Sequence, residues 1–232
     1  MTALSEGYDE FKQALVEDEK ARAYLAQRAL PLEVAQLLGG AYVPWSSEIA
    51  PEFNRFADHL IFPYTPQGFL GRTLRGWKPG MTEEQHRKIL RANKMEAYRS
   101  TSVTGFLPAP PRRVCVMVEG VFDGLSLLAA GFALGAVLVT AGPIFSVENL
   151  PSEVKIVVVA LDGDKMGKQA TKLMAEQLTR RGISVITALP PEDGLGKDWN
   201  ERWQTTRENG LTPVLDAYQA ALALRPGEKS ET

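Results

Sequence analysis

The sequence predicts an α/β protein in which a domain built on a parallel β-sheet follows a smaller α+β subdomain. Four apolar runs rich in β-branched residues alternate with helical segments: residues 114–118, 136–141, 155–161 and 183–189. Runs of this kind without polar alternation are typical of a parallel sheet that is covered on both faces. Upstream, two apolar runs joined by a Pro-Gln-Gly turn over residues 58–76 predict a β-hairpin.

The remaining elements follow from helix and breaker signals taken in chain order. Residues 9–38 predict two short helices, the second of which begins at Pro31, and residues 79–95 are polar, basic and helical in character. The segment LPAPP predicts a domain boundary because neither a helix nor a central strand continues through it. We therefore expect three parts: a subdomain over 1–110, the parallel-sheet domain over 111–203, and a C-terminal helix with a frayed tail over 204–232.

The composition excludes several classes of protein. With 44% hydrophobic and 23% charged residues, the chain has the balance of a globular protein. It has no apolar run of about 20 residues to span a bilayer and no secretory or transit signal, so we expect a cytoplasmic protein without a membrane partner. One cysteine and two histidines exclude both a disulfide framework and a Cys/His zinc ribbon. Any metal must therefore be held by oxygen.

The charge is distributed unevenly along the chain. Residues 72–113 carry ten basic and three acidic side chains, although the net charge of the whole chain is −2. Aromatic residues lie among or beside the basic ones: Phe69, Trp77 and Tyr98. This mixture suits a phosphate backbone with occasional base stacking. A solvated helix face, on which Glu83 and Glu84 pair with Arg87 and Lys88 at i,i+4, is an equally open interpretation.

Acidic residues follow three of the four predicted strands. They are Glu119, Asp123, Asp162, Asp164 and Asp198. Because the carboxyl ends of parallel strands meet at one edge of a sheet, these acids would repel one another unless cations lie between them. Hard oxygen ligands favour Mg²⁺ or Mn²⁺. Individually, Glu119–Gly120 and Asp162–Gly163 could be ordinary turns and Asp198 a helix cap, but their joint placement favours a functional site.

The segment GDKMGK resembles a fragment of a phosphate-binding loop. A Walker A motif needs a Ser or Thr after its lysine, and here Gln169 follows Lys168. This segment is therefore not an ATPase motif, although Lys168 at a helix start could contact a phosphate.

The sequence also resembles a known family. VMVEGVFDGLSLLAAG followed by VVVALDGDKMGKQA looks like the Toprim domain of bacterial (DnaG-like) primases, topoisomerases, recombination-repair proteins and OLD-family nucleases. Upstream, the segments YLAQRALPLEVAQLLGGAYVP, HLIFPYTPQGFLGRTL and AYRSTSVTGFL are similar in order and spacing to the N-terminal subdomain of the DnaG-like RNA polymerase core. The resemblance covers roughly residues 20–203.

Two positions depart from the pattern of that family. Where its members have a lysine before a tyrosine, this chain has Ala97, Tyr98 and Arg99, so Arg99 would supply the missing cation. Where the late metal motif has two aspartates, this chain has Asp198 and then Asn200, which weakens one metal site.

The resemblance implies a DNA primase that synthesises short RNA primers on single-stranded DNA from nucleoside triphosphates with Mg²⁺ or Mn²⁺. It implies a catalytic role for Glu119, Asp162 and Asp164, with Asp123 and Asp198 as further metal ligands. The expected nucleotide or template contacts are Arg72, Arg75, Lys94, Arg99 and Lys168. The missing zinc-binding and helicase modules suggest a helicase or zinc-binding partner, or a minimal phage or mobile-element primase. A Toprim nuclease and a non-catalytic Toprim scaffold are the alternatives.

Overall fold

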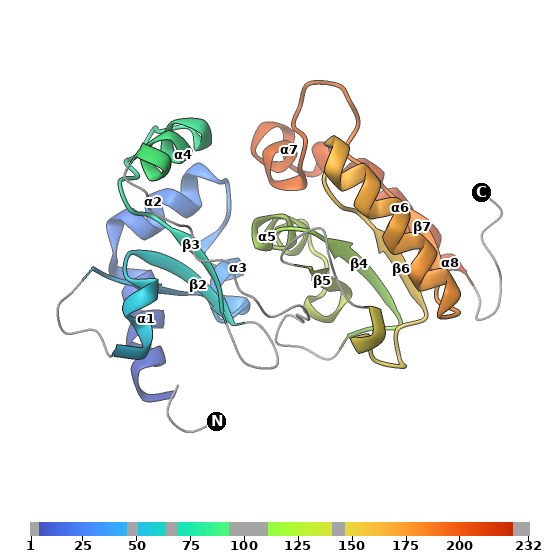
Figure 1. Cartoon of the computed structure of the whole chain (residues 1–232), viewed down its shortest axis with the longest axis horizontal. Coiled ribbons are helices and arrows are strands. Elements are labelled where there is room, and N and C mark those ends of the chain that lie inside the picture. Colours follow the sequence, from blue (N-terminus) through green and yellow to red (C-terminus); the bar gives the residue numbers. More distant parts are fainter. Residues whose placement is uncertain (1–4, 46–50, 64–68, 93–110, 141–146, 225–232) are drawn as a thin grey trace. The chain divides into compact units, whose positions relative to one another are not determined.

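The computed structural model describes most of the 232-residue chain and divides it into two compact units, Met1–Thr101 and Ser102–Thr232. The described residues are 5–45, 51–63, 69–92, 111–140 and 147–224. One unit holds a small antiparallel sheet and the other a parallel four-stranded sheet, which confirms the predicted fold class (Figure 1). No helix within the described ranges has both the length and the apolar character needed to cross a membrane.

The first unit is a three-stranded antiparallel sheet with helices. Its strands, in the order β1-β2-β3, are β1 (Ala41–Val43), β2 (His59–Pro63) and β3 (Phe69–Thr73). Its helices are α1 (Ser5–Glu17), α2 (Glu19–Gln27), α3 (Leu32–Leu37), the 3₁₀ helix η1 (Pro51–Phe56) and α4 (Glu83–Ala92). Strands β2 and β3 pair in antiparallel register from His59↔Thr73 to Pro63↔Phe69, so the predicted hairpin is confirmed.

Two features of this unit differ from the sequence-based expectation. Where one helix was expected before Pro31, the chain forms α1 and α2, because Asp18 leaves the helical conformation and caps α2 by accepting a hydrogen bond from the Ala21 N–H at 2.8 Å. Strand β1 was not expected, since its three residues are all buried and show no alternation.

The second unit is built on four parallel strands in the order β5-β4-β6-β7. These strands are β4 (Val114–Val118), β5 (Val137–Val139), β6 (Ile156–Val159) and β7 (Ser184–Thr187). The helices are α5 (Val121–Ala129), α6 (Lys165–Arg180), α7 (Trp199–Thr206) and α8 (Thr212–Ala223), with the 3₁₀ helices η2 (Leu134–Ala136), η3 (Val147–Asn149) and η4 (Arg207–Leu211).

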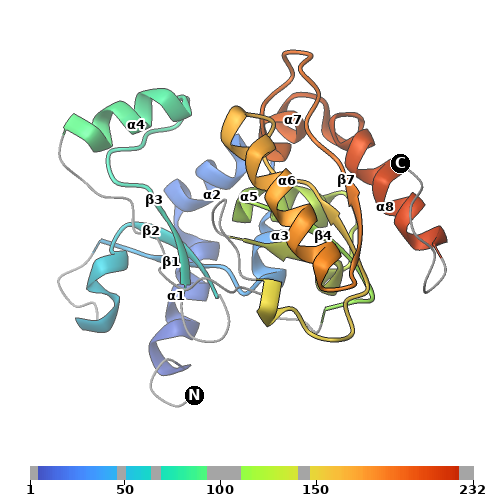
Figure 2. The same ribbon diagram turned by 45° about the vertical axis from the view of Figure 1, so that its right-hand side comes forward.

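Helices cover both faces of the parallel sheet (Figure 2). Met117 of β4 and Val157 of β6 belong to one buried cluster with Met174 and Leu178 of α6. Because side chains alternate along a strand, the neighbouring residues of β4 and β6 point to the opposite face. Helices α5 and α8 also contact these strands. At their carboxyl ends, β4 leads into the polar loop at residues 119–120, and β6 is followed by the polar loop at residues 162–164.

Candidate active site

Glu119 directly follows β4 at the carboxyl end of the sheet and is half-buried. The turn after it is held by Asp123, whose Oδ2 accepts a hydrogen bond from the Gly120 N–H at 3.1 Å. Gly120 is the N-cap of α5 and has no side chain for this purpose, so the carboxylate of Asp123 closes the start of the helix. The position of Glu119 is therefore set by the start of α5.

The loop between β6 and α6 carries Asp162 and Asp164. Asp164 caps α6, because its Oδ1 accepts hydrogen bonds from the N–H groups of Met166 at 3.0 Å and Gly167 at 2.9 Å. A Cβ atom at position 167 would lie 2.1 Å from the carbonyl oxygen of Asp162, so only glycine allows α6 to begin this close to the loop. The sequence thus fixes both aspartates at the end of β6.

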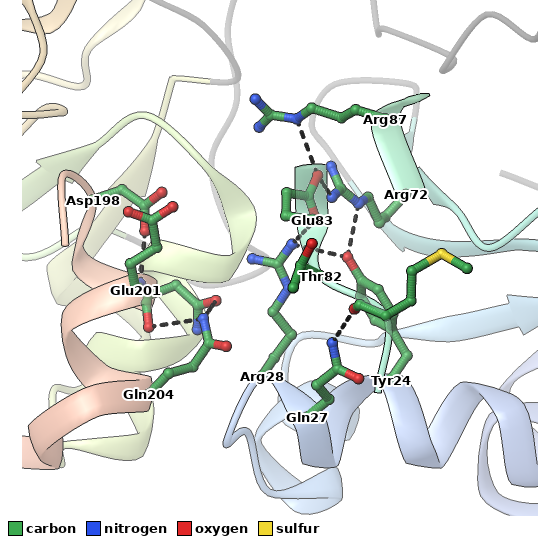
Figure 3. Close-up of polar contacts among 12 residues, drawn as sticks. Tyr24, Gln27, Arg28, Arg72, Thr82, Glu83, Arg87, Asp198, Glu201 and Gln204 are labelled. Carbon is green, nitrogen blue, oxygen red and sulfur yellow. Dashed lines mark hydrogen bonds and ion pairs between the residues drawn. The ribbon is translucent and has the colours of Figure 1, made fainter. Parts of the chain in front are cut away.

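Helix α7 brings a further acid to the same loop. The indole Nε1 of Trp199 donates to the carbonyl of Ala160 at 2.7 Å, and the Gly163 N–H donates to the carbonyl of Lys197 at 2.7 Å. These two hydrogen bonds attach the start of α7 to the end of β6. Asp198, between them, caps α7 by accepting from the Glu201 N–H at 2.7 Å (Figure 3). The capping interpretation of Asp198 is confirmed, and the cap lies beside the loop of Asp162.

The electrostatics show that these acids lie close enough to repel one another. Burial, together with the charges of Glu119 and Asp198, raises the pKa of Asp162 to about 7. Hydrogen bonds from the Gly167 and Met166 N–H groups lower the pKa of Asp164, and the ammonium of Lys197 lies 3.6 Å from its Oδ2. We refer to Glu119, Asp162, Asp164 and Asp198 as the carboxylate cluster.

Asp123 and Asn200 lie beneath this cluster in the interior of the unit. Asp123 is only 6% exposed, and its Oδ1 accepts a hydrogen bond from the Asn200 N–H at 2.9 Å. Burial and the charges of Asp198 and Asp162 raise the pKa of Asp123 well above its ordinary value. The side chain of Asn200 donates to Ser126 Oγ at 3.0 Å and accepts from Gln204 at 3.0 Å. Sequence reasoning missed this network because its partners come from two separate helices.

The carboxylate cluster has the donor chemistry for a divalent cation. Within the described ranges, no three His, Cys, Asp or Glu side chains converge closely enough to hold a metal by themselves. Mg²⁺, however, is commonly bound by one or two carboxylates together with substrate phosphates and water. A cation near Asp162 would remove the repulsion that raises the pKa of this residue. One or two of Glu119, Asp162 and Asp198 therefore fit a magnesium ion whose remaining ligands come from a substrate and water.

The predicted cationic contacts have different surroundings. Arg72 of β3 pairs with Glu83, and its Nε–H donates a hydrogen bond to the Tyr24 hydroxyl at 2.8 Å (Figure 3). Arg75 donates to the Ala57 carbonyl at 3.2 Å, and its guanidinium lies 4.7 Å from the ring centroid of Trp45. Lys168, on α6 of the other unit, pairs with Glu192. Lys94 and Arg99 lie outside the described residues.

The solvated-face interpretation of the basic segment is confirmed for two i,i+4 pairs. Arg87 Nε lies 3.2 Å from Glu83 Oε1, and Lys88 Nζ lies 2.8 Å from Glu84 Oε1. Part of the excess positive charge in residues 72–113 is therefore neutralised within helix α4.

Comparisons with known proteins find a match to a family model within the second unit. Residues 114–208 match the family model for the Toprim domain. The DNA primase of Halalkalibacterium halodurans is 29% identical over 158 residues, which cover 63% of this chain and 25% of that protein. The chain thus spans about a quarter of the length of this curated relative.

Solved structures extend the similarity in fold to both units. A structure of the DnaG catalytic core matches with a TM-score of 0.63 and 18% identity, covering 92% of this chain and 78% of that one. The Aquifex aeolicus primase, with its zinc-binding and RNA polymerase domains, matches with a TM-score of 0.61 and 16% identity, covering 94% of this chain and 60% of that one. A DnaG primase catalytic domain bound to single-stranded DNA gives a TM-score of 0.63 and 17% identity, covering 92% and 77%.

Proposed function

Because residues 114–208 match the Toprim family model and the chain is similar in fold to the DnaG catalytic core, we propose that the protein is a DNA primase. In this proposal it synthesises short RNA primers on single-stranded DNA by metal-dependent nucleotidyl transfer. A helicase or a separate zinc-binding polypeptide would be its protein partner.

The observation that carries the proposal is the gathering of acids at the carboxyl end of the parallel sheet, where hydrogen bonds attach the start of α7 to the end of β6. Three acids from three loops lie there, and burial together with the charges of Glu119 and Asp198 raises the pKa of Asp162 to about 7. A structural turn or cap does not require such repulsion between acids. Because its surroundings disfavour ionisation of Asp162, the arrangement supports a site that is completed by cations and a polyphosphate substrate.

The proposed ligands are the four members of the carboxylate cluster, with Glu119 as ligand or general base. A divalent ion bound there would bring the primer 3′-hydroxyl to the α-phosphate and neutralise the charge of the leaving pyrophosphate. Burial and the charges of Glu119 and Asp198 disfavour ionisation of Asp162, so an ion bound beside it would favour its ionised form. Asp164 and Asp198 also cap α6 and α7, so two helix starts hold their carboxylates in place.

Asp123, which the resemblance implies as a fifth ligand, is better assigned a positioning role. Both of its oxygens accept backbone N–H groups, one from Gly120 beside Glu119 and one from Asn200 beside Asp198. Asp123 would therefore fix the spacing of two ligands rather than bind the ion. Asn200 would act with it, because its amide is directed towards Ser126 and Gln204.

The proposed template and nucleotide contacts are cationic. Arg72, Arg75 and Arg99 are candidates for phosphate oxygens, since guanidinium groups bind them in pairs. Lys94 and Lys168 are the proposed lysine contacts.

Primer synthesis is tested by incubating the purified protein with single-stranded DNA, four labelled nucleoside triphosphates and Mg²⁺ or Mn²⁺, with the products resolved on a sequencing gel. Short oligoribonucleotides that depend on the template are the expected result. Shortened DNA would instead identify a Toprim nuclease. An unchanged template with no product, even after a helicase and a zinc-binding partner are added, would favour a non-catalytic scaffold.

A further inference from the structure

Three arginines from three separate elements converge on one carboxylate in the first unit (Figure 3). Arg28, which follows α2, donates to Glu83 Oε2 at 2.5 Å, and Arg72 of β3 pairs with Glu83 Oε1. Arg87 of α4 reaches the same Oε1 at 3.2 Å. Together with Tyr24, these residues form what we call the Glu83 cluster.

The Glu83 cluster is a built arrangement rather than a chance surface pair. The start of α4 is attached to α2 by Gln27, whose side chain accepts from the Gly80 N–H at 3.0 Å and donates to the Met81 carbonyl at 2.7 Å. Thr82 and Gln85 exchange side-chain and backbone hydrogen bonds at 3.2 and 2.7 Å, which closes the first turn of α4. Glu83 is therefore held in place by the backbone on both sides of it.

Tyr24 holds the two inner guanidinium groups independently of Glu83. Its hydroxyl lies 2.8 Å from Arg72 Nε and 3.0 Å from Arg28 Nη2. Each guanidinium also lies within about 6 Å of the Tyr24 ring, at 5.4 Å for Arg28 and 6.0 Å for Arg72. The two cations therefore have a fixed separation that does not depend on the carboxylate alone.

The Glu83 cluster carries more positive than negative charge and remains open to solvent. Three guanidinium groups face one carboxylate, and the side chains of Arg28, Arg72 and Glu83 are 15%, 25% and 28% exposed. Although burial disfavours its ionisation, the charges of Arg72 and Arg28 lower the pKa of Glu83, so the carboxylate is ionised. Glu83 thus neutralises only part of the cationic charge around it.

We propose that Glu83 occupies a phosphate subsite formed by Arg28 and Arg72, and that a phosphodiester of the single-stranded template replaces it on binding. The carboxylate places one oxygen on each arginine, as the two non-bridging oxygens of a phosphodiester can do. The inference rests on the proposed function, because it assigns the template to this cluster. Glu83 therefore weakens template binding, since the phosphodiester that enters this subsite must first displace the carboxylate.

The test measures binding of a fluorescent oligothymidylate to the full chain by anisotropy across a series of KCl concentrations. Glu83→Gln removes the competing charge, and we expect about tenfold tighter binding and a plot of log K against log[KCl] that is steeper by about 0.7. Glu84→Gln is the matched control. It makes the same charge change on the same helix, but Glu84 is 78% exposed and pairs with Lys88, so we expect a change of about twofold or less.

Arg28→Gln provides a second arm that keeps Glu83 in place. The proposal expects weaker binding and a shallower salt dependence in this variant, and no gain when Glu83→Gln is added to it. Thermal unfolding by circular dichroism first establishes that each variant is folded.

The outcomes separate this inference from the proposed function. If the wild-type chain binds DNA and makes primers but Glu83→Gln binds no more tightly than Glu84→Gln, the phosphate subsite is overturned and the primase remains. Unchanged binding by Arg28→Gln overturns it in the same way, even if Glu83→Gln fails to fold. A wild-type chain that binds no single-stranded DNA at low salt overturns both.

Discussion

Buried acids of the two units have contrasting surroundings. In the first, buried or half-buried acids have cationic partners: Asp58 accepts from Lys20 at 2.7 and 2.8 Å, and Glu83 binds three arginines. In the second, Asp162 lies beside Glu119 and Asp198, and its pKa is raised to about 7. Acids of the first kind stabilise the fold, whereas the ionised carboxylate of Asp162 opposes it.

The surroundings of a carboxylate therefore distinguish an acid that has a structural partner from one that we propose as a cation ligand. Asp123 adds an intermediate case, because it is buried near other acids yet accepts two backbone N–H groups. Replacing acids of each kind therefore tests whether they differ in their contributions to stability and activity.

The largest effect is expected for Asp162→Asn. Primer synthesis should fall by at least about 100-fold, because a proposed cation ligand is lost. The fold should remain intact and become slightly more stable above pH 7, since the repelled charge is gone. Gel assays and thermal unfolding check both parts. Asp216→Asn, on the exposed side of α8, is the control and should change neither primer synthesis nor thermal stability. Retained synthesis in Asp162→Asn would remove the metal-site argument.

Asp58→Ala should be the most destabilising change among the paired acids. Asp58 is 7% exposed, and its loss leaves Lys20 and the Tyr42 hydroxyl, which lies 2.8 Å from Oδ1, without their acceptor. We expect the free energy of unfolding of the first unit to drop by about 2–3 kcal/mol in urea titrations. Asp9→Ala, an exposed acid paired with Lys12 on α1, should cost less than about 0.5 kcal/mol. Equal effects would mean that burial does not distinguish the two pairs.

Asp123→Asn should destabilise the second unit, unlike the chemically identical change at Asp162. The amide nitrogen of Asn would face the N–H group of either Gly120 or Asn200, so one hydrogen bond becomes a contact between two donors. We expect a loss of about 1–2 kcal/mol in unfolding free energy, together with reduced synthesis. Urea titration with and without Mg²⁺ measures this loss of unfolding free energy. A variant as stable as the wild type would argue against the positioning role.

The smallest effect is a pH dependence of folding stability, which has opposite sign in the two units. The pKa of Asp162 is raised above that of the unfolded chain, so its contribution to stability is present in acid and is lost as the pH rises through about 7. Burial lowers the pKa values of His59 and His86, so their contribution is lost as the pH falls below about 6.5.

Hydrogen exchange, corrected for the intrinsic rate at each pH, resolves the two units. Between pH 6 and pH 8 without metal, the protection of the second unit should fall by about 1 kcal/mol, and millimolar Mg²⁺ should abolish this fall. Protection of the first unit should instead decrease from pH 6.5 to pH 5. If protection changed with pH in the same direction in both units, the contrast between their acids would be contradicted.

Local patterns made most of the fold predictable. The hairpin, the parallel strands and the Glu83–Arg87 and Glu84–Lys88 pairs all follow from periodicity and short spacing. The contact of Glu83 with Arg28 was not predictable, because it joins residues 55 positions apart through tertiary packing.

The sequence indicated which acids lie near the carboxyl edge of the sheet, but not what each one contacts. Glu119, Asp162 and Asp164 follow predicted strands directly, whereas Asp123 lies one helical turn on and Asp198 in a later loop. That Asp123 accepts from Asn200, 77 positions away, depends on how α7 packs against α5. A motif specifies which residue types are present, whereas the direction of a buried side chain is decided by the neighbours that it packs against.

The strand order of the second unit also determines how quickly its site can be assembled. The central strand β4 pairs with β6 through contacts such as Val114↔Ile156, while the β2–β3 pair of the first unit joins residues that are close along the chain. Distant pairing slows folding, because the intervening chain loses conformational freedom before the pair forms. In refolding experiments, the antiparallel hairpin should therefore appear first. Recovery of catalysis should lag behind it, limited by closure of the parallel sheet.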